Sequence, residues 1–294
     1  MIVGFPLDDR EFVHEHCNVI DVHEGFMEPQ QPDYNSAIAI AEGIYWVGFY
    51  DVQSGLHCNP YLIVDGNEAV VIDGGSRPDF PTVMMKILET GISASSIIAL
   101  IYQHYDPDLC GSVTHFEDII DRSDLKIISH KENNMFIRHY AISSRLISND
   151  AINSEFLFSS GRKLQFINTP YSHSAGSFVT FDTKTRVLFT SDLFGSYGAK
   201  WNLFLSLNPE CHECKDMTHC IRGEAYCPIP DILRFHQQIM TSEKALRYAL
   251  QAIGRVSAAM IAPQHGSVLS DPGDIEEVSL RLMLLKGVGI DRIL

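Results

Sequence analysis

Strand-length apolar runs recur along this chain of 294 residues and restrict it to folds that contain β-sheets. Ile97–Tyr102 is rich in β-branched residues without polar alternation, which indicates a strand buried on both faces. Three earlier runs, Ile44–Tyr50, Tyr61–Asp65 and Ala69–Ile72, follow one another at hairpin-like spacing. We therefore expect antiparallel pairing early in the chain and a fully buried strand after it.

Segments with helical periodicity alternate with strands in the rest of the chain. Helices are expected at Phe80–Thr90, Gly111–Asp121, Glu132–Leu146 and Ile232–Arg255. Further strands are expected at Leu125–Ser129, Leu164–Asn168, Phe178–Phe181, Val187–Phe189 and Met260–Ala262. Because β-rich and βα segments run through the whole length without an internal repeat, the sequence predicts a single domain over 1–294 with sheets packed between helices.

The amino-acid composition restricts the kinds of partner that the protein can be expected to bind. The 45% hydrophobic content can fill a large core without cross-links. With 22 Lys and Arg against 37 Asp and Glu, the net charge is -15, so neither nucleic acid nor an anionic membrane is an expected partner. The apolar runs are shorter than the roughly 20 residues of a bilayer span. Since the N-terminus also lacks a secretion signal, we expect a cytoplasmic protein.

The residues most informative about chemistry are His104, Asp106 and Asp108, which directly follow the buried strand Ile97–Tyr102. The strand would deliver them to a sheet edge, on a loop where three potential ligands at alternate positions can converge on one or two cations. On its own the motif is weak, because Asp and Pro are ordinary loop residues. The prediction of a metal site therefore depends on further ligand-type residues elsewhere in the sequence.

Three further ligand-type residues have the same setting, just beyond a strand and beside small residues: His173, Asp192 and His265. Each of these residues, taken alone, is more often a turn former, a helix cap or an ordinary surface or core residue. Together with the first motif they predict a metal site. Three aromatic residues after Asp192 either wall the pocket or pack in the core, namely Phe194, Tyr197 and Trp201.

With these positions in order, the chain from about Ile44 to Val268 resembles the metallo-β-lactamase superfamily. In particular, it is similar to the diiron domain of flavodiiron proteins and of their flavin-free relatives, the oxygen-binding diiron proteins. The resemblance implies an α+β fold, the metallo-β-lactamase-like αββα four-layer sandwich, around a non-haem diiron centre. It also implies the ligands: His104, Asp106 and His173 on one iron, Asp108 and His265 on the other, and Asp192 bridging the two.

The donor types agree with iron. Three imidazoles and three carboxylates form a hard, mixed N/O set that suits iron or manganese. Zinc hydrolases of the superfamily usually show His-x-His-x-Asp-His in the first motif, whereas here Asp106 stands at the second His and Leu109 at the last. Because leucine cannot coordinate, we expect the second metal to keep an open position for O2, NO or water. This departure disfavours hydrolysis more than it disfavours binding of a diatomic gas.

Four of the seven cysteines crowd into Asn208–Pro230, a segment with too little apolar periodicity for a regular element. We interpret it as an insertion. In a reducing compartment, thiols so close together suggest a metal rather than disulfides. The alternatives are an iron-sulfur cluster, with 4Fe-4S favoured, a zinc ion, or redox-active thiols. The four are Cys211, Cys214, Cys220 and Cys227, while Cys17, Cys58 and Cys110 stand alone.

Flavodiiron proteins bring FMN to the irons on a C-terminal flavodoxin domain. No segment of that size follows His265, so FMN is not expected. The four-cysteine site would then either replace the flavin as an electron relay or act as a structural element at the edge of the pocket.

The C-terminal segment 275–294 has a helical pattern and ends on apolar residues. Such an ending suits a linker to a further domain or a contact with a partner subunit. The resemblance to flavodiiron proteins also implies a homodimer.

The sequence leaves three functions open. In the first, a reduced diiron pair binds O2 or NO and passes the change in charge and ligation to a signalling partner or a fused effector domain. In the second, an external donor feeds an O2 or NO reductase through the cysteine cluster, and the protein is a flavin-free oxidoreductase. The third is a zinc-dependent hydrolase that uses a metal-bound hydroxide. The missing flavin favours the sensor, because a sensor needs no fast supply of electrons.

Overall fold

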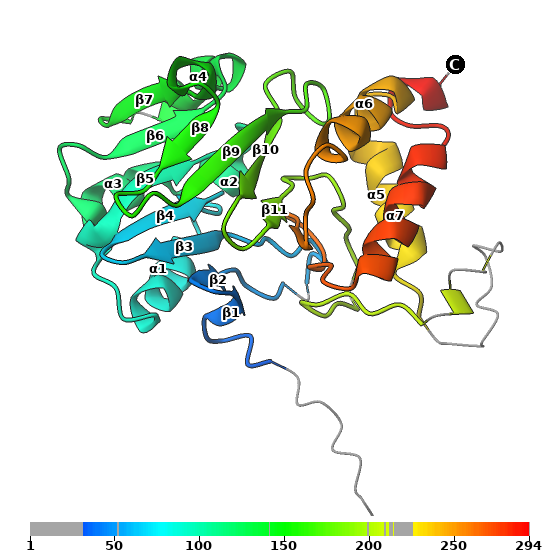
Figure 1. Cartoon of the computed structure of the whole chain (residues 1–294), viewed down its shortest axis with the longest axis horizontal. Coiled ribbons are helices and arrows are strands. Elements are labelled where there is room, and N and C mark those ends of the chain that lie inside the picture. The colour runs from blue at the N-terminus through cyan, green and yellow to red at the C-terminus, as the bar shows by residue number, and fades with distance from the viewer. Residues whose placement is uncertain are drawn as a thin grey trace, which may run out of the picture. The chain divides into compact units, whose positions relative to one another are not determined.

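The computed structural model describes residues 32–51, 53–140, 142–198, 200–208, 210–211, 214 and 226–293. Within these residues the chain forms two β-sheets with helices around them (Figure 1). None of the helices in this part of the chain is both long enough and apolar enough to cross a bilayer.

The first sheet has seven strands in sequence order. Its first four strands pair antiparallel, which confirms the pairing expected from the hairpin-like spacing. From β4 to β7 the pairing is parallel, and helical segments connect the strands. The strands are β1 Ile38–Ala41, β2 Ile44–Trp46, β3 Tyr61–Asp65, β4 Glu68–Ile72, β5 Ile97–Ile101, β6 Lys126–Ser129 and β7 Arg145–Ser148.

The second sheet has five strands in the order β12-β11-β10-β9-β8. Strands β8 to β11 pair antiparallel in sequence order, and β12 joins β11 in parallel from much later in the chain. Because parallel neighbours end at the same edge, the segments after β11 and β12 come together. The strands are β8 Glu155–Leu157, β9 Lys163–Asn168, β10 Phe178–Asp182, β11 Val187–Phe189 and β12 Met260–Ala262.

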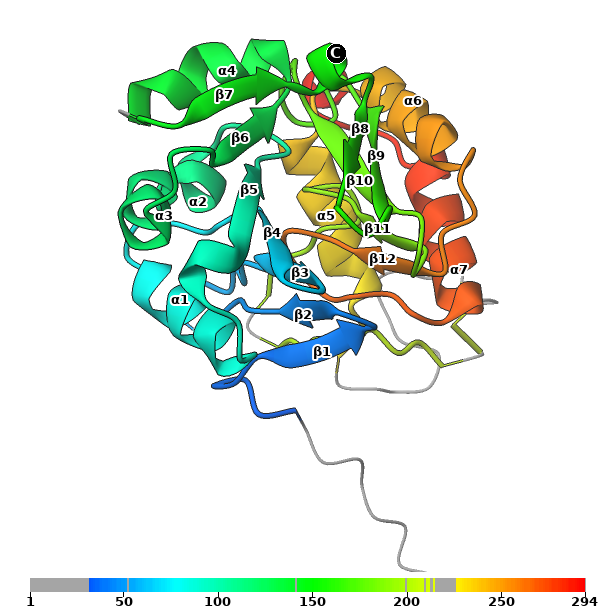
Figure 2. The same cartoon turned by 60° about the vertical axis from the view of Figure 1, so that its left-hand side comes forward.

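Helices cover the outer face of each sheet (Figures 1 and 2). Helices α1 to α4 lie against the first sheet, and α5 to α7 lie against the second. The α-helices are α1 Phe80–Glu89, α2 Pro107–Cys110, α3 Val113–Ile120, α4 Lys131–Ile137, α5 Ile229–Ile239, α6 Glu243–Ile253 and α7 Pro272–Leu284. Short 3-10 helices occur at Ala94–Ser96, Arg138–Tyr140, Asn149–Ile152 and Ile290–Arg292.

Three apolar clusters fill the spaces between these layers. One lies between the two sheets and joins residues such as Ile63 and Ile101 to Phe166 and Phe189. The second lies between the first sheet and its helices, and the third lies between the second sheet and its helices. Side chains alternate along the strands and so contribute to the clusters on both faces of the sheet: Ile63 faces the opposite sheet, and its neighbour Leu62 faces the helices. The αββα sandwich expected from the resemblance is confirmed.

The predicted helix at 132–146 is wrong in its second half. α4 ends at Ile137, and a 3-10 turn follows it. Arg145–Ser148 forms strand β7 beside β6, so its backbone groups find their partners in the sheet rather than in a helix. The sequence pattern also misses the short edge strands β1 and β8.

The predicted helix at 232–255 is two helices. The first ends at Ile239 with Met240 as its C-cap, and Ser242 caps the second, because its side chain accepts a hydrogen bond from the backbone N–H of Ala245. Of the predicted C-terminal helix at 275–294, the described residues 275–293 are helical to the end of α7 and in the 3-10 turn at Ile290–Arg292.

A buried ion pair ties the two sheets together. Arg162, just before β9, donates hydrogen bonds of 3.0 and 2.7 Å to the carboxylate of Asp182 at the end of β10. Its Nη1 also donates to the backbone carbonyl of Val64 in the first sheet, at 3.1 Å. The two charged side chains are 1% and 0% exposed, so neither charge would be hydrated if its partner were lost.

Removal of the positive charge of Arg162 should therefore destabilise the fold. We expect Arg162→Ala to lower the free energy of unfolding by about 3 to 5 kcal/mol, because Asp182 would remain buried without its partner. The matched control is Lys163→Ala, which removes the exposed ion pair with Glu155 and should cost at most about 1 kcal/mol. Urea denaturation followed by circular dichroism measures both values, and equal losses in the two variants would contradict the assignment.

Candidate metal centre

The loop after β5 carries three of the six predicted ligands. His104 lies near its start and is 1% exposed, with Nδ1 at 2.8 Å from Ser191 Oγ. Pro107 begins the short helix α2, a position where its missing N–H costs no hydrogen bond. This turn keeps donor atoms of His104, Asp106 and Asp108 within 4.8 Å of one another.

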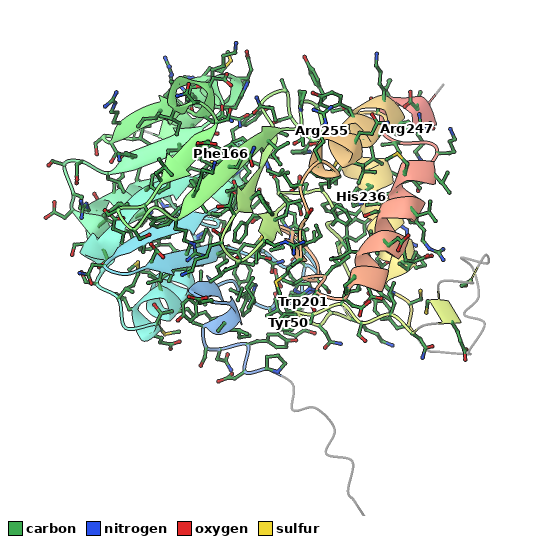
Figure 3. The ribbon with its side chains drawn as sticks, in the orientation of Figure 1. Tyr50, Phe166, Trp201, His236, Arg247 and Arg255 are labelled. Atoms are coloured by element: carbon green, nitrogen blue, oxygen red, sulfur yellow. The ribbon has the colours of Figure 1, made fainter. Side chains whose placement is uncertain are left out.

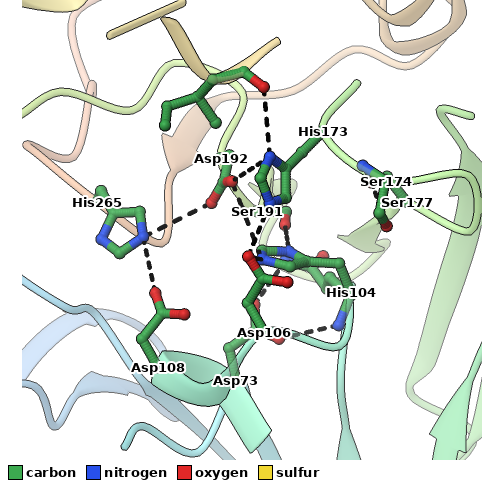
Figure 4. Close-up of polar contacts among 12 residues, drawn as sticks. Asp73, His104, Asp106, Asp108, His173, Ser174, Ser177, Ser191, Asp192 and His265 are labelled. Atoms are coloured by element: carbon green, nitrogen blue, oxygen red, sulfur yellow. Dashed lines mark hydrogen bonds and ion pairs between the residues drawn. The ribbon is translucent and has the colours of Figure 1, made fainter. Parts of the chain in front are cut away.

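The other three predicted ligands reach the same place from the second sheet (Figure 4). His173 lies in the loop between β9 and β10, Asp192 follows β11, and His265 follows β12. Since β11 and β12 are parallel neighbours, Asp192 and His265 meet although they are far apart in the sequence. The structure therefore brings all six predicted residues together.

The first group of donors consists of His104, Asp106, His173 and Asp192. His173 Nε2 is 2.8 Å from Asp106 Oδ2, and His104 Nε2 is 3.9 Å from the Oδ2 atoms of both Asp106 and Asp192. Burial lowers the pKa of His104. Burial also acts to lower the pKa of His173, but its hydrogen bond to Asp106 and the charge of Asp192 raise it to about 9. Negative charge thus dominates the surroundings of His173.

The second group consists of Asp108 and His265 together with the other oxygen of Asp192. His265 Nε2 is 3.1 Å from Asp108 Oδ2 and 3.7 Å from Asp192 Oδ1. Burial acts to raise the pKa of Asp108, but the hydrogen bond and charge of His265 lower it to about 2. Because each Asp192 oxygen faces a different group, this carboxylate has the position of a bridge between two cations (Figure 4).

The arrangement fits a pair of cations. Asp192 is 3% exposed, and its Oδ1 is a buried oxygen without a hydrogen-bond partner in the part of the chain that is described. A buried carboxylate oxygen in this state is costly, and a cation between the two groups would supply the missing partner. Three carboxylates and three imidazoles are the hard N/O donors that suit iron or manganese.

Groups behind the histidines fix the orientation of their rings. Nδ1 of His265 is 3.1 Å from the backbone carbonyl of His57, and Nδ1 of His173 is 3.3 Å from that of Ile239. With Ser191 at Nδ1 of His104, the Nδ1 atom of each ring has a supporting partner, and Nδ1 of His173 also lies 3.7 Å from Asp192 Oδ2. Sequence reasoning misses the two carbonyls, because a backbone group gives no side-chain signal.

Asp73 is a supporting residue that sequence reasoning does not single out. It directly follows β4, has a φ of 53°, and is buried. Its two oxygens accept hydrogen bonds of 2.9 Å from the backbone N–H and the side-chain amide of Gln103. Burial raises the pKa of Asp73 to about 7 despite these bonds. Asp73 thereby holds the residue that precedes His104, and an Asp-Gly-Gly sequence at the end of a strand is its signal.

His236 of α5, labelled in Figure 3, bonds to the turn that follows Asp192. Its Nε2 accepts a hydrogen bond of 3.0 Å from the backbone N–H of Phe194, and its Nδ1 donates to the carbonyl of Ile232 at 2.7 Å. The ring is fully buried, and burial lowers its pKa to about 4. A second proton would have to occupy Nε2, so protonation would break the bond to this turn.

The centre is open to solvent on the side of Asp106. The side chains of His104, Asp192 and His265 are at most 5% exposed, whereas those of Asp106, Asp108 and His173 are 34%, 29% and 23% exposed. A cavity of about 300 Å³ borders Asp106. It is lined by Tyr105, Asp106, Pro107, Phe136, His139 and Tyr140. A small molecule can approach the first group of donors from this side.

The three aromatic residues after Asp192 have different places. Phe194 is buried in the cluster between the second sheet and its helices, as in ordinary core packing. Tyr197 packs against Phe235 of α5, with ring centroids 5.8 Å apart. Trp201 stacks on His57 at 4.6 Å, and so packs against the residue whose carbonyl supports His265; Figure 3 shows it near Tyr50.

The structure describes three cysteines of the 208–230 segment, Cys211, Cys214 and Cys227, whereas Cys220 lies outside the described residues. Arg281 of α7 donates hydrogen bonds to the backbone carbonyls of Cys211 at 3.1 Å and of Cys214 at 2.8 Å. These bonds hold the Cys-x2-Cys pair beside α7. Metal binding by the four cysteines stays a prediction.

A comparison with protein families matches residues 56–266 to a family described as ODP family beta lactamase. Among curated proteins, type A flavoprotein fprA of Rhodobacter capsulatus is 24% identical over 266 residues, which cover 84% of this chain and 55% of that protein. Anaerobic nitric oxide reductase flavorubredoxin of Aeromonas salmonicida is 25% identical over 247 residues, which cover 80% and 44%. The chain thus spans about half the length of these relatives.

Solved structures have the same fold. The apo state of chemotaxis sensor ODP from T. denticola is 25% identical with a TM-score of 0.64, and the match covers 85% of this chain and 98% of that one. A structure described as a peroxy diiron species of chemotaxis sensor ODP gives a TM-score of 0.68 at 24% identity and covers 87% and 97%. Rubredoxin oxygen:oxidoreductase from Desulfovibrio gigas gives 0.71 at 18% identity and covers 85% and 61%.

Loss of a donor from the second group should remove one of the two cations. We expect anaerobically reconstituted Asp108→Ala to contain about one iron fewer per chain than the wild type, because His265 and one oxygen of Asp192 are too few ligands to hold it. Asp118→Ala, an exposed position on α3, is the control and should keep the wild-type content. Metal analysis after gel filtration gives the numbers, and full iron content in Asp108→Ala would refute the grouping.

Acid should weaken the fold partly through His236. Its pKa is about 4 in the folded chain against 6.5 for the ordinary side chain, so the unfolded chain takes up the proton first. The stability from neutral His236 is complete above pH 6.5 and is lost as the pH falls through 4, by at most about 3 kcal/mol. Unfolding free energies of the wild type and His236→Gln should therefore converge between about pH 7 and pH 4.5. A constant difference would show that His236 does not titrate in this way.

Proposed function

Because this chain belongs to the ODP family of beta lactamases, we propose that it is a non-haem diiron protein that binds O2 or NO and acts as a sensor module. The observation that carries the proposal is the position of Asp192, whose two oxygens face two separate groups of histidine and aspartate donors. Such an arrangement is what a pair of bridged cations requires.

In this proposal His104, Asp106 and His173 hold one iron, Asp108 and His265 hold the other, and Asp192 bridges them. The separations within each group support the division, since His173 lies beside Asp106 and His265 lies beside Asp108. When bound, iron would supply reversible changes of oxidation state and a coordination position for a diatomic ligand.

The residues of the chain set the conditions for this chemistry. The buried side chains of His104, Asp192 and His265 exclude water from one side, and the cavity beside Asp106 admits a small molecule from the other. Leu109 lies in the core between the first sheet and its helices, so it occupies no donor position. The second group therefore has fewer protein ligands than the first, which suits binding of a gas.

Hydrogen bonds connect the His173 loop to the C-terminal segment, which supports a sensor. The carbonyl of Tyr171 accepts a hydrogen bond of 2.6 Å from Thr241 Oγ1, between α5 and α6. The carbonyl of Thr241 in turn accepts one of 3.0 Å from the backbone N–H of Ile290. Ile290 and Ile293 are 54% and 80% exposed apolar side chains. A change in the ligation of His173 thus has a short path to a surface on which a signalling partner or a fused effector domain can dock.

The comparisons are consistent with a sensor. Two of the solved structures that share the fold are described as chemotaxis sensor ODP, at 24% and 25% identity. We further propose a cytoplasmic homodimer that uses no FMN and binds neither nucleic acid nor membrane.

A sensor should bind gas without turning it over. We expect the anaerobically reduced, iron-loaded chain to take up about one O2 or NO per centre and then to stop. Uptake should stop even when an excess of a reductant other than dithionite is present. An oxygen or NO electrode with a chemical one-electron donor measures this. Asp192→Asn should bind no gas, and the exposed Asp118→Ala should behave as the wild type. Sustained consumption over many turnovers would replace the sensor with a reductase.

The reductase is the second candidate, and one relative bears the name of an anaerobic nitric oxide reductase. In this case Cys211, Cys214, Cys220 and Cys227 would hold a 4Fe-4S cluster that passes electrons to the irons. The bonds from Arg281 to the carbonyls of Cys211 and Cys214 give the first pair a fixed place on α7, as a cluster site requires.

Iron, acid-labile sulfide and zinc in anaerobically purified protein separate these possibilities. A cluster predicts about four sulfides per chain and the loss of all of them in Cys211→Ser/Cys214→Ser. Zinc without sulfide would give the segment a structural role and rule it out as an electron relay.

A further inference from the structure

The thiol of Cys58 lies beside the second group of donors. Cys58 is 4% exposed, and its Sγ is 3.8 Å from Nδ1 of His265. One donor atom each from Cys58, Asp108 and His265 lie within 4.8 Å of one another. Two ligands of one cation, with bonds of about 2.0 to 2.3 Å, are separated by at most about 4.6 Å. These three side chains therefore have nearly the spacing of ligands that share a cation.

Backbone pairing fixes the position of Cys58. An antiparallel bridge joins Cys58 to His265, and the N–H of Asn59 donates to the carbonyl of Gln264 at 2.8 Å. The side-chain amide of Asn59 donates to the carbonyls on both sides of His265, those of Pro263 at 3.0 Å and Gly266 at 2.8 Å. Cys58 and His265 are thus held as a rigid pair, although 207 positions separate them.

The second group also lacks a donor. Asp108, His265 and Asp192 Oδ1 supply three protein ligands, and Leu109, which stands where the hydrolase pattern has its last His, is buried in the core. Asp192 Oδ1 is buried and has no hydrogen-bond partner in the described part of the chain, so an unsatisfied oxygen points into the same space. A tetrahedral or larger coordination shell needs at least one more ligand.

We propose that Cys58 is a fourth protein ligand, as a thiolate, of the cation held by Asp108 and His265. The inference rests on the metal centre proposed above and adds a soft ligand to it. Coordination would release the thiol proton to solvent, and one metal–sulfur bond would form without any change of oxidation state. The sulfur would add a fourth protein ligand, which in a five- or six-coordinate shell still leaves a position for O2 or NO, and would favour iron, cobalt or zinc over magnesium or manganese at this position.

A merely supporting role is the alternative. In that case the thiol stays protonated beside Nδ1 of His265 and orients the ring without a bond to the metal. The two roles differ in one observable, because only a ligand gives a thiolate-to-metal charge-transfer band and a sulfur neighbour about 2.3 Å from the metal.

Cobalt binding to the full-length chain tests this. Metal-free protein with Cys211, Cys214, Cys220 and Cys227 replaced by Ser removes the other clustered thiols, and two equivalents of Co2+ are then added without oxygen. We expect a near-ultraviolet thiolate band that Cys58→Ser abolishes, with at least about tenfold weaker binding of the second ion. The control is Cys110→Ser, because Cys110 is also buried but its Sγ lies against the carbonyl of His104. This variant should keep both the band and the affinity.

Two results would overturn the proposal in different ways. If Cys58→Ser binds both ions with an unchanged band, Cys58 is not a ligand, but the metal centre stands. If Asp108→Ala binds as much Co2+ as the same chain with Asp108, with Cys58 present in both, the proposed centre itself fails. X-ray absorption of this cobalt-loaded protein needs no Cys58 variant to fold: one sulfur at about 2.3 Å supports the proposal, and a shell of nitrogen and oxygen alone refutes it.

Discussion

The structure depends on keeping three carboxylates, those of Asp106, Asp108 and Asp192, close together in a largely buried place. Their mutual repulsion is strong where water is scarce, unless positive charge stands among them. The neighbouring histidines supply part of it, as the lowered pKa of Asp108 and the raised pKa of His173 show. Two cations would supply the rest. Binding of cations at this place would therefore also stabilise the fold.

The sandwich makes such a cluster possible because loops of both sheets end at one place. The first sheet contributes the loop after β5, and the second contributes the segments after β9, β11 and β12. The three histidines are each held by a hydrogen bond from behind, which limits how far the donors can move apart to relieve their repulsion. Cys58 belongs to the same construction, since the bridge to His265 is part of what fixes both residues.

Much of the fold could be predicted because most of its strands are recognisable from the residues within them. Tyr61–Asp65, Val187–Phe189 and Met260–Ala262 are observed with the predicted bounds, since apolar β-branched runs of this kind carry their own signal. The prediction was wrong where a tertiary partner decides. Arg145–Ser148 is a strand because β6 lies beside it, and the break between α5 and α6 at Ser242 is accompanied by a bridge to Gly289 near the end of the chain.

For the site, the sequence by itself determined which residues can act as donors, because a ligand-type residue just beyond a strand is a local pattern. The resemblance to flavodiiron proteins also implied their grouping around Asp192, but only the tertiary structure decided that one oxygen of Asp192 faces each group and that Cys58 lies beside His265. It also supplied Asp73, His236 and the carbonyl of His57 as supports. These relations join segments from 30 to more than 200 residues apart, so no local pattern contains them.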